Sequence, residues 1–442
     1  MNYVLIRNGT IVNSKETYVS DVLIGNNKII DVAENISRPD PETPVIDATG
    51  KFVLPGAIDT NRTFSDLGAI NDEMLKLCRA EIIGGTTSML EVLEARSKLK
   101  SSDVVHISRK HSAESLLDFS FHIPLNGWSA FNDNSLEFCF AHEGITTFYI
   151  KSFTEQNIKR DTLKRILKKI NELGLLLLVE INEPDISGSG YTGAGSNYDE
   201  LVSFHLENLR SILDLITETQ TSTYFFNISF KEELDLLFDA QKKNNNIYAE
   251  LALPCYIGEG LDFVVDEKTI LQGFPLEGKL TLIPFDQFWT LLKDEHFLAA
   301  RPTLRVSNID DSNDMQVFNR PDKYFVLKNT LSVLFTAGVT TGNIEITDFC
   351  NMVSEKPAKL MGMYPQKGLI SSGSDADILI WDPETDRNLY FSFPQNINSS
   401  NPSSKLKGKS QFVFINGVMA YDGEVFYGQN LSGKFLYRIP SY

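Results

Sequence analysis

The stretch 52–59, FVLPGAID, marks the point where the rhythm of this sequence changes. Before it, short β-branched runs are separated by turn signals such as Asn8-Gly9, a pattern typical of β-hairpins. After it, apolar strand-like runs alternate with amphipathic helical segments, among them 157–173. The stretch therefore predicts a junction between a strand-rich start and an alternating α/β body.

The body contains eight apolar runs, each followed or preceded by a helical pattern. Eight strand–helix alternations over about 300 residues favour a (β/α)8 barrel of the TIM type over an open sheet. The predicted strands are residues 52–58, 86–92, 119–123, 147–150, 175–181, 224–228, 247–253 and 297–300.

Beyond residue 364 the chain returns to short strands, with Asn416-Gly417 as a turn between two of them. Two strand-rich ends around one barrel would pack together as a small β-sandwich. We therefore predict an α/β protein with two parts. Residues 1–53 and 365–442 form a composite β-sandwich, and residues 54–364 form the barrel.

The composition narrows the class of partner. The 442 residues carry a formal net charge of −17, which argues against nucleic acid and anionic membrane because both require a positive face. The start of the chain lacks the pattern of a signal peptide, and the apolar run 175–179 is far too short to span a bilayer. The four cysteines form no CxxC pair, so a zinc ribbon or disulfide framework is not indicated. We expect a soluble, cytoplasmic protein.

Three blocks of sequence resemble one enzyme family. They are VIDATGKFVLPGAID at 45–59, GGTT at 84–87, and the segment 357–383 with PAKL, YPQKG and GSDADILIWDP. Together they resemble amidohydrolases, and dihydropyrimidinases and hydantoinases in particular, over nearly the whole chain. Dihydroorotases and allantoinases share similar blocks. The resemblance implies a TIM-like barrel whose relatives hydrolyse C–N bonds of cyclic amides.

The resemblance also implies a metal site. Family members hold two divalent metals, usually zinc, at the C-terminal mouth of the barrel, and these metals activate a water that opens the ring. The ligands are an HxH after strand one, a carbamylated lysine on strand four, one histidine after each of strands five and six, and an aspartate after strand eight. Because alternate residues of a strand share a face, HxH places both imidazoles on one side.

In this sequence every one of those positions holds another residue type. The strand-eight position is open between Thr303 and Asn308. The other equivalents are Asn61, Thr63, Tyr149, Glu180 and Asn227. Amide and hydroxyl oxygens bind transition metals more weakly than imidazole does, and a phenol cannot be carbamylated. We therefore predict no binuclear metal centre, no other cofactor and no family-type catalytic residue.

Three further observations bear on the predicted absence of a metal or other cofactor. Lys151 lies two residues after Tyr149 on the same strand face, so a shifted register would restore a lysine. The run 188–193 spells GxGxxG but does not directly follow a strand, so we interpret it as a loop rather than a dinucleotide site. None of the six histidines falls at a ligand position.

Polar residues predicted near the mouth are the candidates for a pocket: Arg62, Glu91, Lys151, Glu180, Asn182 and Glu250. Arg62 and Lys151 would supply positive charge there. Our hypothesis is that Glu180 pairs with one of these basic residues, or accepts a hydrogen bond from Asn61 or Asn227, where metal sits in relatives.

Three functions follow from these patterns. The first is a non-catalytic binding or scaffold protein, similar to dihydropyrimidinase-related neuronal proteins or inactive dihydroorotase-like partners of transcarbamoylases. The second is a divergent hydrolase of cyclic amides that uses Glu180 as general base or a single weak metal. The third is a sensor of a small cyclic ureide. The resemblance also implies a homo-oligomer, a dimer or a tetramer.

Overall fold

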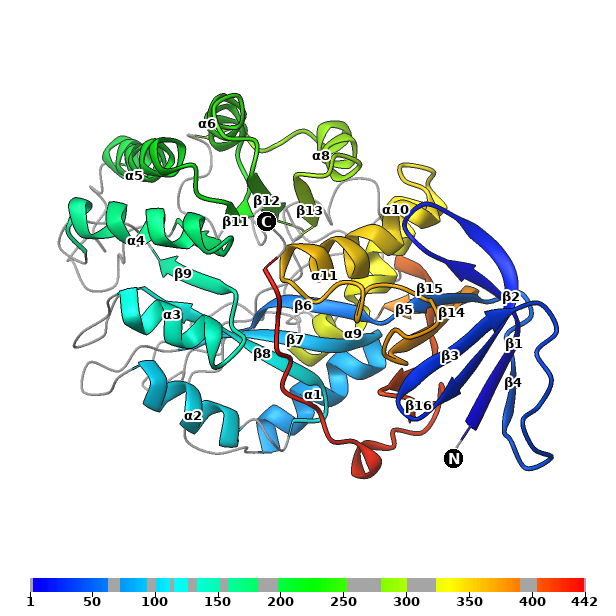
Figure 1. Ribbon diagram of the computed structural model, residues 1–442. Helices are drawn as coiled ribbons and strands as arrows, with labels where there is room; N and C mark the ends of the chain where they lie inside the picture. Colours follow the sequence, from blue (N-terminus) through cyan, green and yellow to red (C-terminus); the bar gives the residue numbers. More distant parts are fainter. Residues whose placement is uncertain are drawn as a thin grey trace, which may run out of the picture.

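The computed structural model is built on two sheets, one from the middle of the chain and one from its two ends (Figure 1). None of the described helices combines the length and hydrophobicity that a membrane crossing requires. The structure describes residues 3–62, 72–93, 101–111, 115–125, 133–151, 158–181, 198–252, 280–299, 323–389 and 404–440.

Eight parallel strands follow one another in chain order in the central sheet, and helices between them form an outer layer (Figure 1). This arrangement confirms the predicted (β/α)8 barrel. The strands are β6 (Ala57–Arg62), β7 (Thr86–Val92), β8 (Asp118–Pro124), β9 (Thr147–Lys151), β10 (Leu176–Glu180), β11 (Thr223–Ile228), β12 (Ile247–Leu251) and β13 (Phe297–Ala299). The helices are α1 (Asp72–Gly84), α2 (Ser101–His111), α3 (Asp133–Ala141), α4 (Arg160–Glu172), α5 (Tyr198–Thr219), α6 (Lys231–Gln241), α8 (Phe285–Leu292) and α9 (Lys323–Leu334).

The second sheet, called the terminal sheet here, joins both ends of the chain. Strand β5 lies between β1 and β14, and its antiparallel register with β14 pairs Pro55 with Ile378. Apolar residues from both ends share one buried cluster. The strands are β1 (Tyr3–Val12), β2 (Thr17–Gly25), β3 (Lys28–Ala33), β4 (Val45–Asp47), β5 (Phe52–Pro55), β14 (Ile378–Leu389), β15 (Ser404–Ile415) and β16 (Val418–Tyr421).

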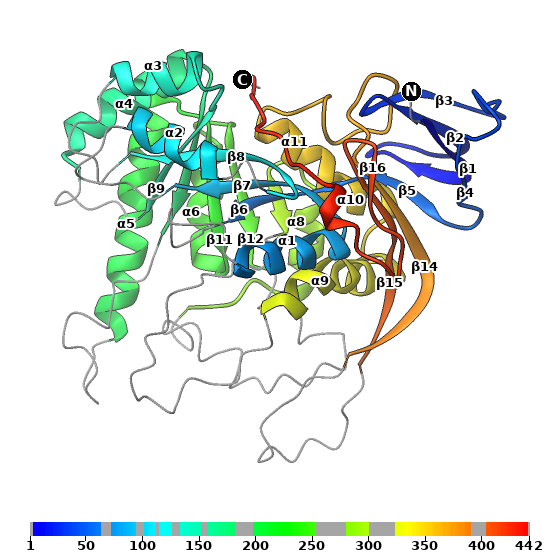
Figure 2. The ribbon, with the colours of Figure 1, turned by 90° about the horizontal axis from the view of Figure 1, so that it is seen from below.

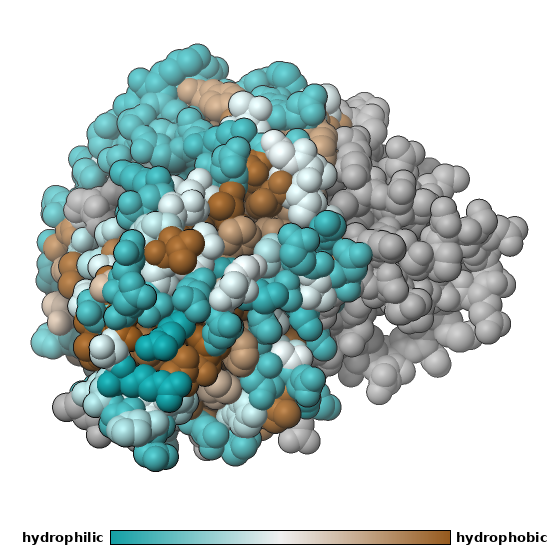
Figure 3. Space-filling view, turned by 90° about the vertical axis from the view of Figure 1, so that its right-hand side faces the viewer, coloured by the Kyte–Doolittle hydropathy of each residue, from teal (hydrophilic) through white to brown (hydrophobic). Residues whose placement is uncertain are grey.

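The two halves of the terminal sheet have different surroundings. The long strands β14 and β15 run beside the barrel, where the Ser332 hydroxyl of α9 donates to the carbonyl of Gly408 (Figure 2). The side of the molecule that carries β1 to β4 shows hydrophobic patches among hydrophilic residues (Figure 3). Val19 on β2 and Ile30 on β3 are exposed.

Two details of the sequence prediction were wrong, namely one strand and one turn. The predicted strand 52–58 is two strands, because Gly56 separates β5 of the terminal sheet from β6 of the barrel. A Cβ at Gly56 would lie 2.1 Å from the hydroxyl oxygen of Thr87, so the close approach of the two segments requires glycine. Asn8-Gly9 makes no hairpin: Asn8 has a φ of 58° and produces a bulge inside the single strand β1.

The N-terminal end of the barrel is closed by the segment that follows α9. The Ser354 hydroxyl donates to the carbonyl of Gly56, just before β6, and the Lys356 ammonium donates to that of Phe297 in β13 at 2.7 Å. The segment thus bridges the first and last barrel strands. Its elements and the remaining short helix are η3 (Phe335–Thr340), α10 (Ile346–Cys350), η4 (Asn351–Glu355), α11 (Lys356–Leu360) and η5 (Gly428–Asn430).

The C-terminal segment 433–440 covers the same end of the barrel (Figure 1, red). Its backbone pairs with β8 around Phe119, and Arg438 inserts its side chain into the interior. The guanidinium donates to the hydroxyls of Ser120, at 3.0 Å, and Thr147, at 2.8 Å, and to the carbonyl of Phe121. Burial lowers the pKa of Arg438 to about 9. The interior is therefore sealed at this end by residues 433–440.

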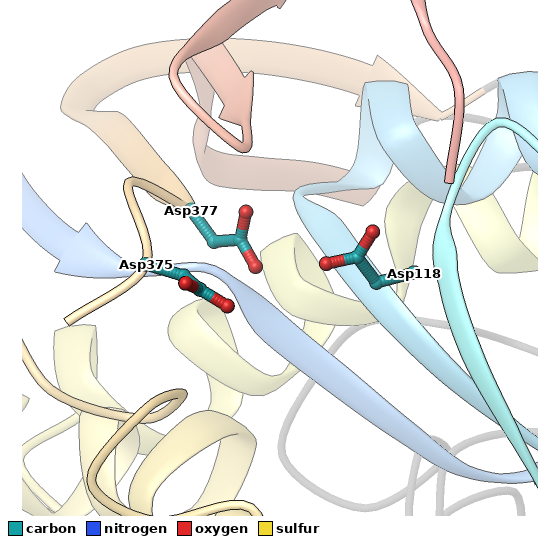
Figure 4. A group of neighbouring side chains, drawn as sticks. All are labelled: Asp118, Asp375 and Asp377. Carbon is teal, nitrogen blue, oxygen red and sulfur yellow. The ribbon is translucent and has the colours of Figure 1, made fainter. Parts of the chain in front are cut away.

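A buried ionic cluster joins the barrel to the terminal sheet. The carboxylates of Asp118 on β8, Asp375 and Asp377 converge on one point (Figure 4), and the Lys367 ammonium lies there. It is 2.5 Å from Asp118, 3.0 Å from Asp375 and also bonded to Asp377. Burial opposes the charge on Lys367, but the three carboxylates raise its pKa above the usual value. Asn416 adds a 2.8 Å hydrogen bond to Asp118.

We predict that Lys367→Ala lowers the free energy of unfolding by about 3–5 kcal/mol, because it leaves buried carboxylates without their cation. Lys359→Ala, which removes a half-exposed partner of Glu355, should cost about 1 kcal/mol or less. Urea unfolding followed by circular dichroism measures both. Equal losses in the two variants would contradict the role assigned to Lys367.

Candidate functional site

The mouth of the barrel, meaning the C-terminal ends of its strands, is lined with aromatic rings. The rings of Tyr224 and Phe226 on β11 meet edge to face with centroids 5.2 Å apart. The Tyr149 ring on β9 lies 6.2 Å from that of Phe226. All three belong to a buried cluster distinct from the one between strands and helices, so they face the barrel axis.

A tyrosine–glutamate hydrogen bond links strands β9 and β10. The hydroxyl of Tyr149 donates to the Oε2 atom of Glu180, the last residue of β10. In the strand register Tyr149 lies beside Leu178, and Glu180 lies beside Lys151, so the bond runs diagonally across the pair. Both side chains are buried. Tyr149, not Lys151, therefore projects into the interior at the predicted lysine position.

The same arrangement recurs on the next pair of strands. The hydroxyl of Tyr224 on β11 donates to the Oε2 atom of Glu250 on β12 at 2.9 Å. Tyr224 lies beside Tyr248 in the register, so Glu250 is again two residues further along the neighbouring strand. The mouth thus holds two Tyr–Glu pairs with one geometry.

Glu250 is the more deeply buried carboxyl of the two. Burial raises its pKa from 4.5 to about 8, although Tyr224, the backbone N–H of Asn227 and the side chain of Asn61 favour its charged form. Burial and the neighbouring Glu250 also raise the pKa of Tyr224 well above its usual value. Asn227 lies at a shift in the β11 register with a φ of 56°, a conformation that asparagine tolerates. Asn61, Asn227 and Glu250 therefore meet at one place.

Arg62 does not have the role predicted for it. Its guanidinium is buried and donates to the carboxylates of Asp59 on β6 and Glu81 on α1. Burial opposes its charge, but these two carboxylates raise the pKa of Arg62. Arg62 therefore anchors the end of β6 to α1, and its positive charge is already balanced. The hydrogen bond shown for Glu180 comes from Tyr149, a donor absent from our hypothesis.

The remaining candidates are only partly placed. Glu91 on β7 is buried beside Arg62 in the strand register. Lys151 ends β9 and is exposed. Four predicted positions lie outside the described residues: Thr63, Asn182, Thr303 and Asn308.

Comparison with known proteins shows which family this chain resembles. Residues 310–420 match the model of the amidohydrolase family. The D-hydantoinase of Geobacillus stearothermophilus is 26% identical over 467 residues, covering 98% of this chain and 96% of that protein. The dihydropyrimidinase of Arabidopsis thaliana is 25% identical over 468 residues, covering 99% and 86%. The crystal structure of dihydropyrimidinase from Brevibacillus agri NCHU1002 shares the fold, with a TM-score of 0.78, 23% identity and coverage of 99% and 98%.

This chain belongs to the amidohydrolase family. Within it, the relatives named hydantoinase and dihydropyrimidinase place the chain in the branch that our sequence analysis indicated.

The described ligand positions of this amidohydrolase do not fit a binuclear metal centre. They offer two amides, a phenol and a carboxylate, and that carboxylate already accepts a hydrogen bond from the Tyr149 hydroxyl. The resemblance implies imidazole at three of these positions and a carbamylated lysine at the fourth, and none of the four has the implied ligand. Within the described part of the chain, one group of three suitable side chains lies close enough to share a metal, namely Asp118, Asp375 and Asp377. Lys367 already lies among them.

The sequence analysis did not identify Tyr224 or Asp59 as residues of the site. A signal was present for Tyr224, because Tyr224 and Phe226 share one strand face and together indicate an aromatic inner wall. His122 on β8 is buried and hydrogen-bonded: its Nδ1 lies 2.6 Å from the Thr147 hydroxyl and its Nε2 2.9 Å from the carbonyl of Thr60. Burial and nearby Arg438 hold its pKa well below the usual value.

Glu250 should make stability depend on pH. Because its folded-state pKa of about 8 exceeds the ordinary 4.5, the folded protein keeps a proton that the unfolded chain releases. Its contribution to stability therefore falls, by up to a few kcal/mol, as pH rises between these values. Glu250→Gln removes this loss, so its melting temperature should gain on that of the wild type from pH 5 to pH 9.

Thermal unfolding by circular dichroism measures this gain. Leu178→Ala, another interior substitution without a titrating group, is the control and should differ from wild type by a constant amount. A pH-independent difference for Glu250→Gln would contradict the assignment.

Proposed function

We propose that this chain is a non-hydrolytic member of the cyclic-amide amidohydrolase family that works as a binding or scaffold protein. The observation that carries the proposal is the Tyr149–Glu180 hydrogen bond. It joins the position equivalent to the carbamylated lysine with that of the strand-five histidine. The residues at two positions whose equivalents bind metal in relatives are hydrogen-bonded to each other in this chain.

The chemistry of ring opening supports this proposal. A cyclic amide is a poor electrophile, and the family reaction depends on metals that activate water. Glu180 accepts a hydrogen bond from Tyr149, and Glu250 accepts one from Tyr224, so both carboxyls are engaged by phenols. Neither arrangement supplies a replacement for a metal-bound hydroxide.

The alternative is a divergent hydrolase in which Glu180 is the general base. Its burial at the mouth gives this alternative a physical basis. Such an enzyme would lose turnover in Glu180→Gln while remaining folded, whereas our proposal expects no turnover to lose.

Metal analysis and ring-opening assays test the proposal together. Protein produced with added zinc and bicarbonate should contain less than about 0.2 metal equivalents per chain, because the mouth lacks imidazole ligands. Dihydrouracil, hydantoin and dihydroorotate should remain closed under the same conditions. Two bound zinc ions, or turnover abolished by Glu180→Gln, would refute the proposal.

We also propose that the chain is a cytoplasmic homo-oligomer, a dimer or tetramer, as the resemblance implies. The exposed apolar side chains of Val19 and Ile30 on the terminal sheet are of the kind that interfaces cover. Light scattering after size-exclusion chromatography should give a mass of two or four chains of 49.7 kDa. A concentration-independent monomer would contradict this expectation.

A further inference from the structure

Arg438 is a buried cation whose hydrogen bonds, within the described part of the chain, all go to neutral oxygens. It is only 3% exposed. Its guanidinium donates to two hydroxyls and two carbonyls, those of Ser120, Thr147, Phe121 and Met361. A buried charge is usually paired, because an unpaired charge removed from water is unfavourable. Leu436 fills the same interior with an apolar side chain, so sealing the barrel does not by itself explain the charge.

The hydroxyl of Thr147 lies between Arg438 and the histidine of β8. A guanidinium can only donate, so the Thr147 oxygen accepts from Arg438 at 2.8 Å and its own proton is left to donate. That proton favours the Nδ1 atom of His122, at 2.6 Å, over the carbonyl of Phe121, at 3.5 Å. Arg438 therefore orients the hydroxyl that meets His122.

The imidazole of His122 is fixed in one neutral form as a result. Its Nε2 atom lies 2.9 Å from the carbonyl of Thr60, which can only accept, so Nε2 bears a proton. Its Nδ1 atom accepts from Thr147 and bears none. Burial and the positive charge of Arg438 hold the pKa of His122 well below its usual value, in agreement with a neutral ring.

Thr60 and Tyr224 continue this run of contacts to the barrel mouth. The carbonyl of Thr60 accepts from His122, and the side chain of Thr60 is hydrogen-bonded to the Tyr224 hydroxyl. Tyr224 in turn donates to Glu250 at 2.9 Å. The run of hydrogen bonds, continuous through Thr60, thus crosses the barrel interior from its N-terminal end to its mouth. It begins at a residue of the C-terminal segment 433–440.

We infer that Arg438 is a positioning residue that couples the C-terminal segment to the barrel mouth. It does so by fixing the Thr147 hydroxyl and the tautomer of His122, which in turn fix Thr60 and Tyr224. A displacement of the segment would then alter the hydrogen bonding of Tyr224, which the segment's listed hydrogen bonds do not reach directly. The inference goes beyond the proposed function and does not rest on it, because it names no ligand and requires no turnover.

The tautomer of His122 gives a direct measurement. Thr147→Val keeps the shape of the side chain but removes its hydroxyl, and Thr147→Ser keeps the hydroxyl. In nitrogen-15 NMR of histidine-labelled protein at about pH 7.5, wild type and Thr147→Ser should show a protonated Nε2 and a hydrogen-bonded, unprotonated Nδ1. His122→Gln identifies the signals.

The decisive variant in this measurement is Arg438→Met, which leaves both Thr147 and His122 in place. Its Nδ1 signal should move in the same direction as that of Thr147→Val, because the Thr147 hydroxyl is no longer held by Arg438. An Nδ1 signal that stays at its wild-type position in folded Arg438→Met would overturn the inference.

A double-mutant cycle tests whether the effect reaches the mouth. Distant side chains with no shared partners contribute additively to stability, whereas coupled ones do not. In urea unfolding, Arg438→Met and Tyr224→Phe together should depart from additivity by at least about fivefold in the unfolding equilibrium constant. Tyr427→Phe removes a hydroxyl that donates to Asp422, outside this run, and should be additive with Arg438→Met within about twofold.

The milder Thr147→Val takes the place of Arg438→Met in the cycle if the latter does not fold. The same departure from additivity with Tyr224→Phe is then expected, and Thr147→Ser should retain most of it. Additivity between either variant and Tyr224→Phe would show that the hydrogen bonds act separately and would refute the coupling. Bound zinc or ring opening, which would refute the proposed function, would leave this inference standing.

Discussion

The ammonium group of Lys367 is the contact on which the two sheets depend. It lies between a carboxylate of barrel strand β8 and two carboxylates of the segment leading into β14. A cation removed from water in this way is stable only while its partners remain in place, so the cluster fixes how the terminal sheet meets the barrel. The family resemblance near the C-terminal end includes Lys367, Asp375 and Asp377. These blocks therefore preserve an architecture, and they carry no information about whether the opposite end of the barrel performs chemistry.

At that opposite end, phenols have become the hydrogen-bond donors to buried carboxyls. Tyr149 and Tyr224 each reach diagonally to a glutamate on the next strand. The repetition follows from parallel pairing, because neighbouring strands present residues at a constant offset. Each pair holds its own proton without help from a metal ion. Such a wall combines aromatic rings with buried carboxyls, and its side-chain hydrogen bonds join neighbouring barrel strands at the described positions.

Sequence periodicity was sufficient to predict most of the framework. The apolar spacing in 157–173 predicted α4, and four of its apolar residues are indeed buried. Failures came where a single backbone position decided the outcome, as with the bulge at Asn8 and the junction at Gly56. The partners of charged side chains were harder still to predict. Arg62 donates to Glu81, nineteen residues away in the sequence, and Glu180 accepts from Tyr149, thirty-one residues away. Such contacts depend on strand register and helix placement, which one sequence does not display.

The C-terminal segment has a consequence for the order of events during synthesis. Arg438 and the backbone around residue 436 seal the N-terminal end of the barrel, yet they leave the ribosome more than three hundred residues after β8, the strand that they contact. Strand β5 likewise waits for β14, more than three hundred residues later, before its second edge is paired. The nascent chain therefore carries an open barrel and an unpaired strand edge until these later segments have emerged. A ribosome stalled before residue 433 would hold a protein whose barrel strands are all made but whose N-terminal barrel end is unsealed.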